Sequence, residues 1–235
     1  MKRDFNLEFK DLIKNTLAKS LKEIGFKKSN LNFMRSTDNF VQTCNVQKSL
    51  YNSIDSIKFT INYGFFVPVV HSVIKKTTDL PIFPKTYDCC IADRMGFGIY
   101  GRDYWYEINE NITLELLTKQ FKNDIENYLI SMFQKIQTMS SLLKFVRINC
   151  SEGKIVVNNI VAAVLEFEFG DYERGKELLI SEYNDAVIPK LTEGKIVYPD
   201  GSEEITYSEF RLNEYYIEFC KQIAEKYKVN FLIKE

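Results

Sequence analysis

The sequence predicts an α+β fold in which an N-terminal helix packs on an antiparallel sheet and a mostly helical C-terminal half follows. Three observations lead to this prediction. Apolar residues recur at helical spacing over residues 5–24, at every second position in segments between residues 31 and 66, and again at helical spacing after residue 113. With 235 residues, 45% of them hydrophobic, the chain can bury one large core or two small ones without disulfides.

The first helix is predicted over residues 5–24, and Gly25 supplies the usual C-terminal stop. Three antiparallel strands are predicted next, over residues 31–35, 40–49 and 57–66. In the third strand the odd-numbered positions are apolar, whereas Lys58, Thr60 and Asn62 between them are polar. One face of the sheet is therefore expected to pack on a helix and the other to stay polar.

Prolines and glycines break this pattern between residues 67 and 104, so an irregular stretch is expected there, with a strand near residues 104–108. The stretch is either a functional loop or an insertion without a role. Helical spacing then predicts two helices within residues 113–148 that meet near residues 138–141. Further helices are predicted over residues 155–169, 172–183 and 208–228, and a hairpin turn over residues 198–202.

The predicted elements suggest a module of helix and antiparallel sheet over residues 1–110 and a helical region over residues 111–235. The helical region either forms a separate domain or packs with the first module as one unit. Residues 1–102 carry 16 Lys and Arg against 9 Asp and Glu, whereas residues 103–235 carry 15 against 23. A basic half can attract nucleic acid or an acidic partner, but two oppositely charged halves can equally dock on each other, which is the simpler interpretation.

The chain opens with charged residues and an amphipathic helix in place of a secretory signal, and its apolar runs are far shorter than the roughly 18 residues of a membrane span. We therefore expect a cytoplasmic protein without membrane association. The cysteines are odd in number and lack paired C-x-x-C spacing, so reduced and mostly buried thiols are expected. They are Cys44, Cys89, Cys90, Cys150 and Cys220.

Short motifs carry a resemblance to a known family. They are Gly25-Phe26-Lys27-Lys28, Phe33-Met34-Arg35, Val46-Gln47-Lys48-Ser49, Phe59-Thr60-Ile61-Asn62-Tyr63-Gly64, then Cys90 and Asp93-Arg94-Met95-Gly96. In this order they resemble a bacterial family of domains of unknown function, the one numbered 4304, over residues 5–135. The resemblance implies no activity, although some bacterial proteins of this general kind lie beside toxins or act as immunity proteins. Residues 162–179 resemble one helical hairpin of a tetratricopeptide-type repeat, but a single copy favours a generic hairpin.

The sequence contains little that points to catalysis. His71 is the only histidine, which excludes a mechanism or a metal site that needs two imidazoles, and we expect it to serve packing. Glycines at 96, 98 and 101 match the spacing Gly-x-Gly-x-x-Gly, but a strand-like segment follows where a nucleotide site needs a helix. Four acidic residues around a predicted turn are expected to form solvated surface: Glu166, Glu168, Asp171 and Glu173. No cofactor and no metal is expected.

The most coherent candidate surface is the polar face of the predicted sheet. Its candidate binding residues are Arg35, Gln47, Lys58, Asn62 and Arg94. This set offers hydrogen-bond donors without a nucleophile or a base that titrates near neutral pH, so binding is favoured over catalysis. The leading hypothesis is a non-enzymatic protein that binds a macromolecular partner, in the manner of an immunity protein. The alternatives are a small-anion-binding protein or enzyme that uses the same face, and nucleic-acid binding by the basic N-terminal half.

Overall fold

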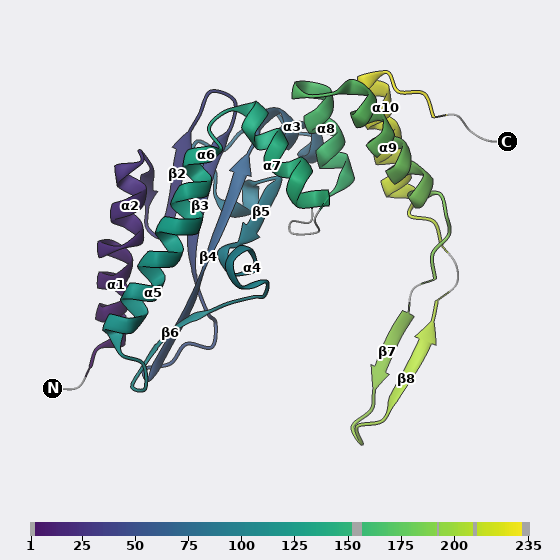
Figure 1. The fold of residues 1–235 in the computed structure, drawn as a ribbon. Coiled ribbons are helices and arrows are strands. Elements are labelled where there is room, and N and C mark those ends of the chain that lie inside the picture. The colour runs from purple at the N-terminus through teal and green to yellow at the C-terminus, as the bar shows by residue number, and fades with distance from the viewer. Residues whose placement is uncertain (1–2, 152–156, 192, 209–210, 232–235) are drawn as a thin grey trace. The chain divides into compact units, whose positions relative to one another are not determined.

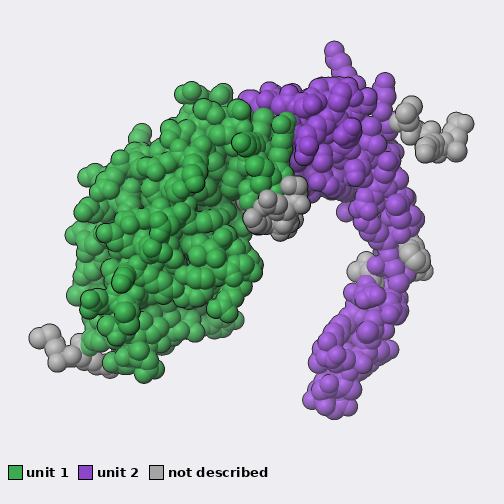
Figure 2. Space-filling view, viewed as in Figure 1, with its two compact units in different colours: residues 1–157 green, residues 158–235 purple. Residues whose placement is uncertain are grey.

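A computed structural model describes residues 3–151, 157–191, 193–208 and 211–231 of the chain. The chain folds into two compact units, residues 1–157 and residues 158–235, which Figure 2 colours separately. The predicted α+β class is confirmed: helices and an antiparallel sheet form the first unit, and the C-terminal half is mostly helical. Among the described residues, no helix combines the length and the apolar character that a membrane crossing requires.

The first unit is built on a six-stranded sheet whose strand pairs are all antiparallel. Its strands are β1 (Lys27–Ser29), β2 (Asn32–Ser36), β3 (Val41–Lys48), β4 (Ser56–Phe66), β5 (Ile91–Arg94) and β6 (Tyr106–Asn109). The order is β1-β2-β3-β4-β5, and β6 also pairs with β4. The three predicted strands correspond to β2, β3 and β4. The short strand β1 was not predicted, because all three of its residues are exposed and show no apolar alternation.

Helices cover one face of this sheet. Figure 1 shows this for the helical run from α5 to α6, which crosses in front of β3 and β4. They are α1 (Phe5–Asn15), α2 (Leu17–Glu23), α5 (Leu114–Asp124), the π-helical segment η2 (Ile125–Ile130), α6 (Ser131–Lys135) and α7 (Met139–Ser151). The predicted first helix is present as α1 and α2, which meet at Thr16. Gly25 follows with a φ of 89°, a conformation that favours glycine.

An aromatic cluster joins the helices to the sheet. Phe59 of β4 packs edge-on against Phe9 of α1 at 5.2 Å and against Phe121 of α5 at 5.4 Å. Phe65, farther along β4, contacts Phe133 of α6 at 6.2 Å and Phe145 of α7 at 5.6 Å. Such pairs contribute roughly 0.5–1.5 kcal/mol each beyond their buried area. This cluster is the core of the first unit, as the alternation in β4 predicts.

The stretch between residues 67 and 104 is more regular than expected. It contains α3 (Pro68–Lys75), the 3₁₀ turn η1 (Thr86–Asp88), β5 and α4 (Met95–Tyr100). Pro68 occupies the first turn of α3, where its missing N–H is tolerated, so this proline begins a helix instead of interrupting one. The glycine spacing also has a packing role, because a Cβ at Gly98 would lie 1.9 Å from Oη of Tyr128.

The described residues of the second unit form three helices and a hairpin. Its elements are α8 (Asn159–Phe169), α9 (Tyr172–Ala186), β7 (Glu193–Val197), β8 (Glu203–Tyr207) and α10 (Glu214–Tyr227). Asp171 caps α9 by accepting the backbone N–H groups of Glu173 and Arg174, which explains the break after α8. Stacked rings of Phe167 and Tyr227, 4.5 Å apart, join α8 to α10.

The limits of the two units differ from the expected division at residue 110. That position lies between β6 and α5, and both elements belong to the first unit. The physical reason is that α5, α6 and α7 supply the cover of the sheet through residues such as Phe121, Phe133 and Phe145. The helices after residue 158 form the second unit.

Candidate binding surface on the polar face of the sheet

The face of the sheet opposite the helices carries a row of polar side chains. The strand register places Asn32 opposite Asn45, Asn45 opposite Asn62, and Asn62 opposite Arg94, so the row crosses β2, β3, β4 and β5. Gln47 and Lys58 point to the same side because side chains alternate along each strand. We call these six residues the polar face: Asn32, Asn45, Gln47, Lys58, Asn62 and Arg94.

Amide groups in this row bind one another. Nδ2 of Asn45 donates to Oδ1 of Asn32 at 2.9 Å, and Nδ2 of Asn62 donates to Oε1 of Gln47 at 3.0 Å and to Oδ1 of Asn45 at 3.3 Å. These contacts fix the amide orientations and leave part of each side chain exposed to solvent. The row is therefore a rigid set of donors and acceptors held by four strands.

Both basic residues of the polar face are paired with acids. Nη1 of Arg94 donates to Oδ2 of Asp103 at 2.5 Å, and the guanidinium lies over the ring of Trp105, 5.1 Å from its centroid. Nε1 of Trp105 donates to the same Asp103 oxygen at 3.1 Å. Asp103 thus holds the cation and the indole together as one unit beside the amide row.

Lys58 lies 3.4 Å from Oε2 of Glu107, its cross-strand partner on β6. Partial burial raises the pKa of Glu107, but the hydroxyl of Ser56, which donates at 2.7 Å, and the charge of Lys58 outweigh it, so the net shift is downward. The carboxylate is ionised at neutral pH and neutralises the lysine. The polar face therefore has little uncompensated positive charge.

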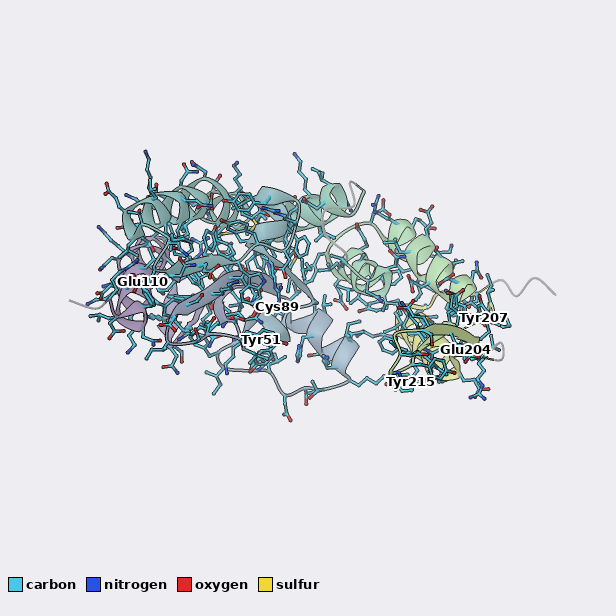
Figure 3. All side chains as sticks on the ribbon, turned by 90° about the horizontal axis from the view of Figure 1, so that it is seen from below. Tyr51, Cys89, Glu110, Glu204, Tyr207 and Tyr215 are labelled. Carbon is cyan, nitrogen blue, oxygen red and sulfur yellow. The ribbon has the colours of Figure 1, made fainter. Side chains whose placement is uncertain are left out.

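A groove of about 340 Å³ opens on this face. It is lined by Gln47, Ser49, Leu50, Tyr51, Lys58 and Trp105. Leu50 and Tyr51 belong to the loop between β3 and β4 and are 97% and 95% exposed, and Ile54 in the same loop is 77% exposed. Figure 3 shows Tyr51 on the side of the sheet away from the helices. The lining of the groove combines the indole of Trp105, the amide of Gln47 and the exposed side chains of Leu50 and Tyr51, which we call its rim.

The structure brings four of the five predicted binding residues to this face and places Arg35 on the other. Arg35 is opposite Gln42 in the register, and its Nε donates to Oε1 of Gln42 at 2.8 Å. Its two other nitrogens donate to the carbonyl oxygens of Ile24 and Phe133, both at 2.7 Å. Burial lowers the pKa of this guanidinium. Arg35 ties α2, β3 and α6 together, so its expected convergence with the other four residues does not occur.

Sequence reasoning missed four residues that line the groove: Trp105 and the loop residues Ser49, Leu50 and Tyr51. A signal for Trp105 was present, because it alternates with Tyr106, which is 2% exposed and stacks on Phe59 at 5.5 Å. If Tyr106 points into the core, the residue before it must point outward. Tyr51 lies in a loop, where no period predicts the direction of a side chain.

The residues considered for catalysis have structural partners. Nδ1 of His71 lies 3.1 Å from the carbonyl oxygen of Asp88, and its ring packs on Phe66 at 4.9 Å. Burial raises the pKa of Cys89, and it raises the pKa of Cys90 to about 11, so neither thiol is a ready nucleophile at neutral pH. Four described cysteines are free: Cys44, Cys89, Cys90 and Cys220. The side chain of Cys150 lies outside what the structure describes.

The acidic residues around the α8–α9 turn are also engaged. Glu166 accepts the backbone N–H of Asp171 at 3.0 Å and lies 3.3 Å from the guanidinium of Arg174. Glu168 accepts the hydroxyl of Tyr227 at 2.6 Å. Within the described ranges, no group of three or more His, Cys, Asp or Glu side chains is arranged to hold a metal ion. Glu166, expected on the surface, is 3% exposed and stabilises the turn.

Comparison with known proteins gives one match. The family described as Domain of unknown function (DUF4304) matches residues 17–135, which is 119 of the 235 residues. No curated protein and no solved structure matches the chain. The family match agrees with the resemblance carried by the short motifs, and its span includes the whole polar face.

Proposed function

The chain belongs to the family described as Domain of unknown function (DUF4304), and since that description assigns no activity, we propose from the site alone that it binds another protein through the polar face and its groove. The proposal places this binding in the bacterial cytoplasm, as four free cysteines are typical of a reducing compartment. Neutralisation of a toxin, in the manner of an immunity protein, is the form of binding that the family resemblance suggests.

The observation that carries the proposal is the exposed rim of the groove. Leu50 and Tyr51 are at least 95% exposed and line the groove together with Trp105, over whose ring Arg94 lies; Ile54, in the same loop, is 77% exposed. Aromatic residues and arginine are enriched where protein interfaces gain most of their affinity, and the amide row offers specific hydrogen bonds around them. Large apolar side chains gathered next to such a groove are typical of a surface that a partner covers.

A protein fits this surface better than a small anion does. The two cations of the face are already paired with Asp103 and Glu107, so an anion would have to displace a carboxylate. The first unit carries 22 Lys and Arg against 16 Asp and Glu, a net charge of +6, which favours the approach of a partner with a net negative charge. Apolar contact with the rim then contributes affinity that a small anion cannot provide.

The test uses tagged full-length protein to capture partners from its native host at low salt, followed by titration of the purified partner. Trp105→Ala and the double variant Leu50→Ser/Tyr51→Ser are each expected to weaken binding at least tenfold, since truncation of a central interface residue costs more than about 1.4 kcal/mol. Ile82→Ser is the matched control, because Ile82 is 99% exposed in the same unit but is not part of the groove. Circular dichroism verifies that each variant is folded.

Equal affinity of all variants for the partner would show that the polar face is not the binding site. Small-anion binding makes a different prediction, in which an anion raises the melting temperature of the wild type and Arg94→Ala and Asn62→Ala both abolish that rise. Co-purified nucleic acid whose affinity falls steeply with salt would instead support binding by the basic half.

A further inference from the structure

The hairpin of β7 and β8 lacks the support that a two-stranded hairpin normally needs. In the described part of the chain these two strands pair only with each other, and nearly all of their residues are exposed. A solitary hairpin is marginally stable in water, and a third strand or a packed face usually stabilises it. Val197, Ile205 and Tyr207 are 63%, 59% and 60% exposed. Figure 3 shows Glu204 and Tyr207 on this hairpin.

The hydrogen-bonding pattern shows which backbone groups of β8 are available. Tyr198 donates its N–H to the carbonyl oxygen of Ser202 at 2.9 Å, so these two residues form a hydrogen-bonded pair at the turn. Such pairs alternate with non-hydrogen-bonded pairs along an antiparallel ladder. In the observed register, Glu203, Ile205 and Tyr207 fall at the non-hydrogen-bonded positions, so their N–H and C=O groups point away from β7.

The outer edge of β8 is complementary to itself. If two β8 strands pair antiparallel about Ile205, Ile205 meets its own copy, Glu203 meets Tyr207, and Glu204 meets Thr206. Ile205, Glu203 and Tyr207 all have outward-pointing backbone groups, so both strands present donors and acceptors in matching positions. No like charges face each other, and the central pair is apolar.

The outer edge of β7 does not have this property. Its outward-pointing residues are Glu193, Lys195 and Val197, so the equivalent symmetric pairing centres on Lys195 and brings two lysines together. Like charges directly opposite each other destabilise a strand pair. The two edges of one hairpin therefore differ in whether they can pair with a second copy.

We propose that β8 is a homodimerisation edge: two copies of this chain pair their β8 strands antiparallel about Ile205 and form a continuous four-stranded sheet. The symmetry is two-fold, so the same edge serves both copies and the association closes at two. Each hairpin supplies the additional strands that the other lacks. This interface is independent of the polar face of the first unit.

The hairpin is acidic, which gives the pairing a salt dependence. Residues 193–207 contain four acids (Glu193, Asp200, Glu203 and Glu204) and one base, Lys195, for a net charge of −3. Two such hairpins repel each other weakly, and salt screens that repulsion. Dimerisation through β8 is therefore expected to strengthen as salt rises. Docking of the hairpin on the basic first unit of another copy would weaken instead.

The experiment measures the oligomeric state of the full-length protein by sedimentation velocity over a concentration series. Ile205→Pro is the disrupting variant, because proline removes an outward N–H and leaves the bonds to β7 intact. Lys195→Pro is the matched control, since it makes the same change on the β7 edge. We expect a concentration-dependent dimer for the wild type and for Lys195→Pro, and at least a tenfold weaker dimer for Ile205→Pro.

A second measurement tests the proposed dimer without disrupting it. Ile205→Cys places two thiols across the dyad, within the 4.4–6.8 Å Cα separation that disulfides span, so mild oxidation should give a covalent dimer. Lys195→Cys should give no covalent dimer under the same conditions, because residue 195 lies on β7 and not on the paired β8 edge. A wild type that is monomeric at every concentration, a dimer that Ile205→Pro leaves unchanged, or one that weakens with salt would each overturn the proposal.

Discussion

Replacement of Arg35 by methionine separates a structural role from a binding role for this residue. The three side-chain nitrogens donate to Gln42, Ile24 and Phe133, at distances of 2.7–2.8 Å. Methionine keeps the length of the apolar stem and removes all three donors. The sequence pattern predicts that Arg35 contributes to binding, whereas its position in the structure predicts that it contributes to stability.

The hydrogen bonds set the size of the effect. Hydrogen bonds from a charged donor contribute roughly 1.5–3 kcal/mol each, and the desolvation of the guanidinium offsets part of that. The carbonyl of Phe133 keeps a second donor, Nε2 of Gln42 at 3.0 Å, so its loss is partial. Taking about 1 kcal/mol net for each bond, Arg35→Met should lower the free energy of unfolding of the first unit by ~3 kcal/mol.

Urea unfolding followed by tryptophan fluorescence measures this change in the first unit alone, because Trp105 is the single tryptophan and lies there. With a urea m-value of about 2 kcal/mol/M, the midpoint should fall by ~1.5 M. Lys58→Met is the control, because the ion pair of Lys58 with Glu107 is largely exposed. Its loss should lower the free energy of unfolding by less than about 1 kcal/mol and the urea midpoint by less than ~0.5 M. A midpoint for Arg35→Met equal to that of the control would refute the structural role.

Three further predictions concern other residues of the first unit. Asp124 is 6% exposed and accepts the hydroxyl of Tyr106 at 2.6 Å, so Asp124→Asn should destabilise the unit by about 1–2 kcal/mol in urea unfolding, as charge-assisted bonds are lost. Burial raises the pKa of Cys90 to about 11, so stability from this thiol should be present below pH 9 and lost as pH rises toward 11; Cys90→Ala should flatten that part of a pH titration of the midpoint. Gly98→Ala places a Cβ against the ring of Tyr128 and should lower the melting temperature. In a chain that already carries Tyr128→Ala, Gly98→Ala should lower the melting temperature much less, because the clashing ring is absent.

Sequence periodicity predicted the parts of the fold that depend on one apolar face. The alternation in residues 57–66 correctly assigned Phe59 and Phe65 to the core, because an alternating strand that is half-buried has only one consistent orientation. The same reasoning failed for Arg35, since its charge suggested the polar side although the strand parity put it beside buried Gln42. A buried arginine is compatible with the core only when acceptors are supplied from distant segments, here residues 24 and 133, and one strand does not reveal these.

The candidate site was predictable in its strands and not in its loops. Gln47, Lys58 and Asn62 share a face because they share parity in paired strands, and Arg94 joins them through β5. The groove also depends on the β3–β4 loop and on Trp105. The position of the loop depends on how the chain turns between the two strands, and the position of Trp105 depends on the pairing of β6 with β4. The strand predicted near residues 104–108 corresponds to β6, but the four residues of β5 show no period, and the pairing of both strands with β4 is a tertiary effect.

The two proposed surfaces lead to one further prediction about avidity. A dimer formed through β8 carries two polar faces, so it can bind an immobilised partner at two points, whereas a monomer binds at one. Ile205→Pro should therefore dissociate at least tenfold faster than the wild type from a densely coated sensor surface. Both proteins should bind a soluble monomeric partner with the same affinity in calorimetry, because the groove is unchanged. If the variant also loses affinity in solution, the β8 edge belongs to the partner interface itself, and the two surfaces are not independent.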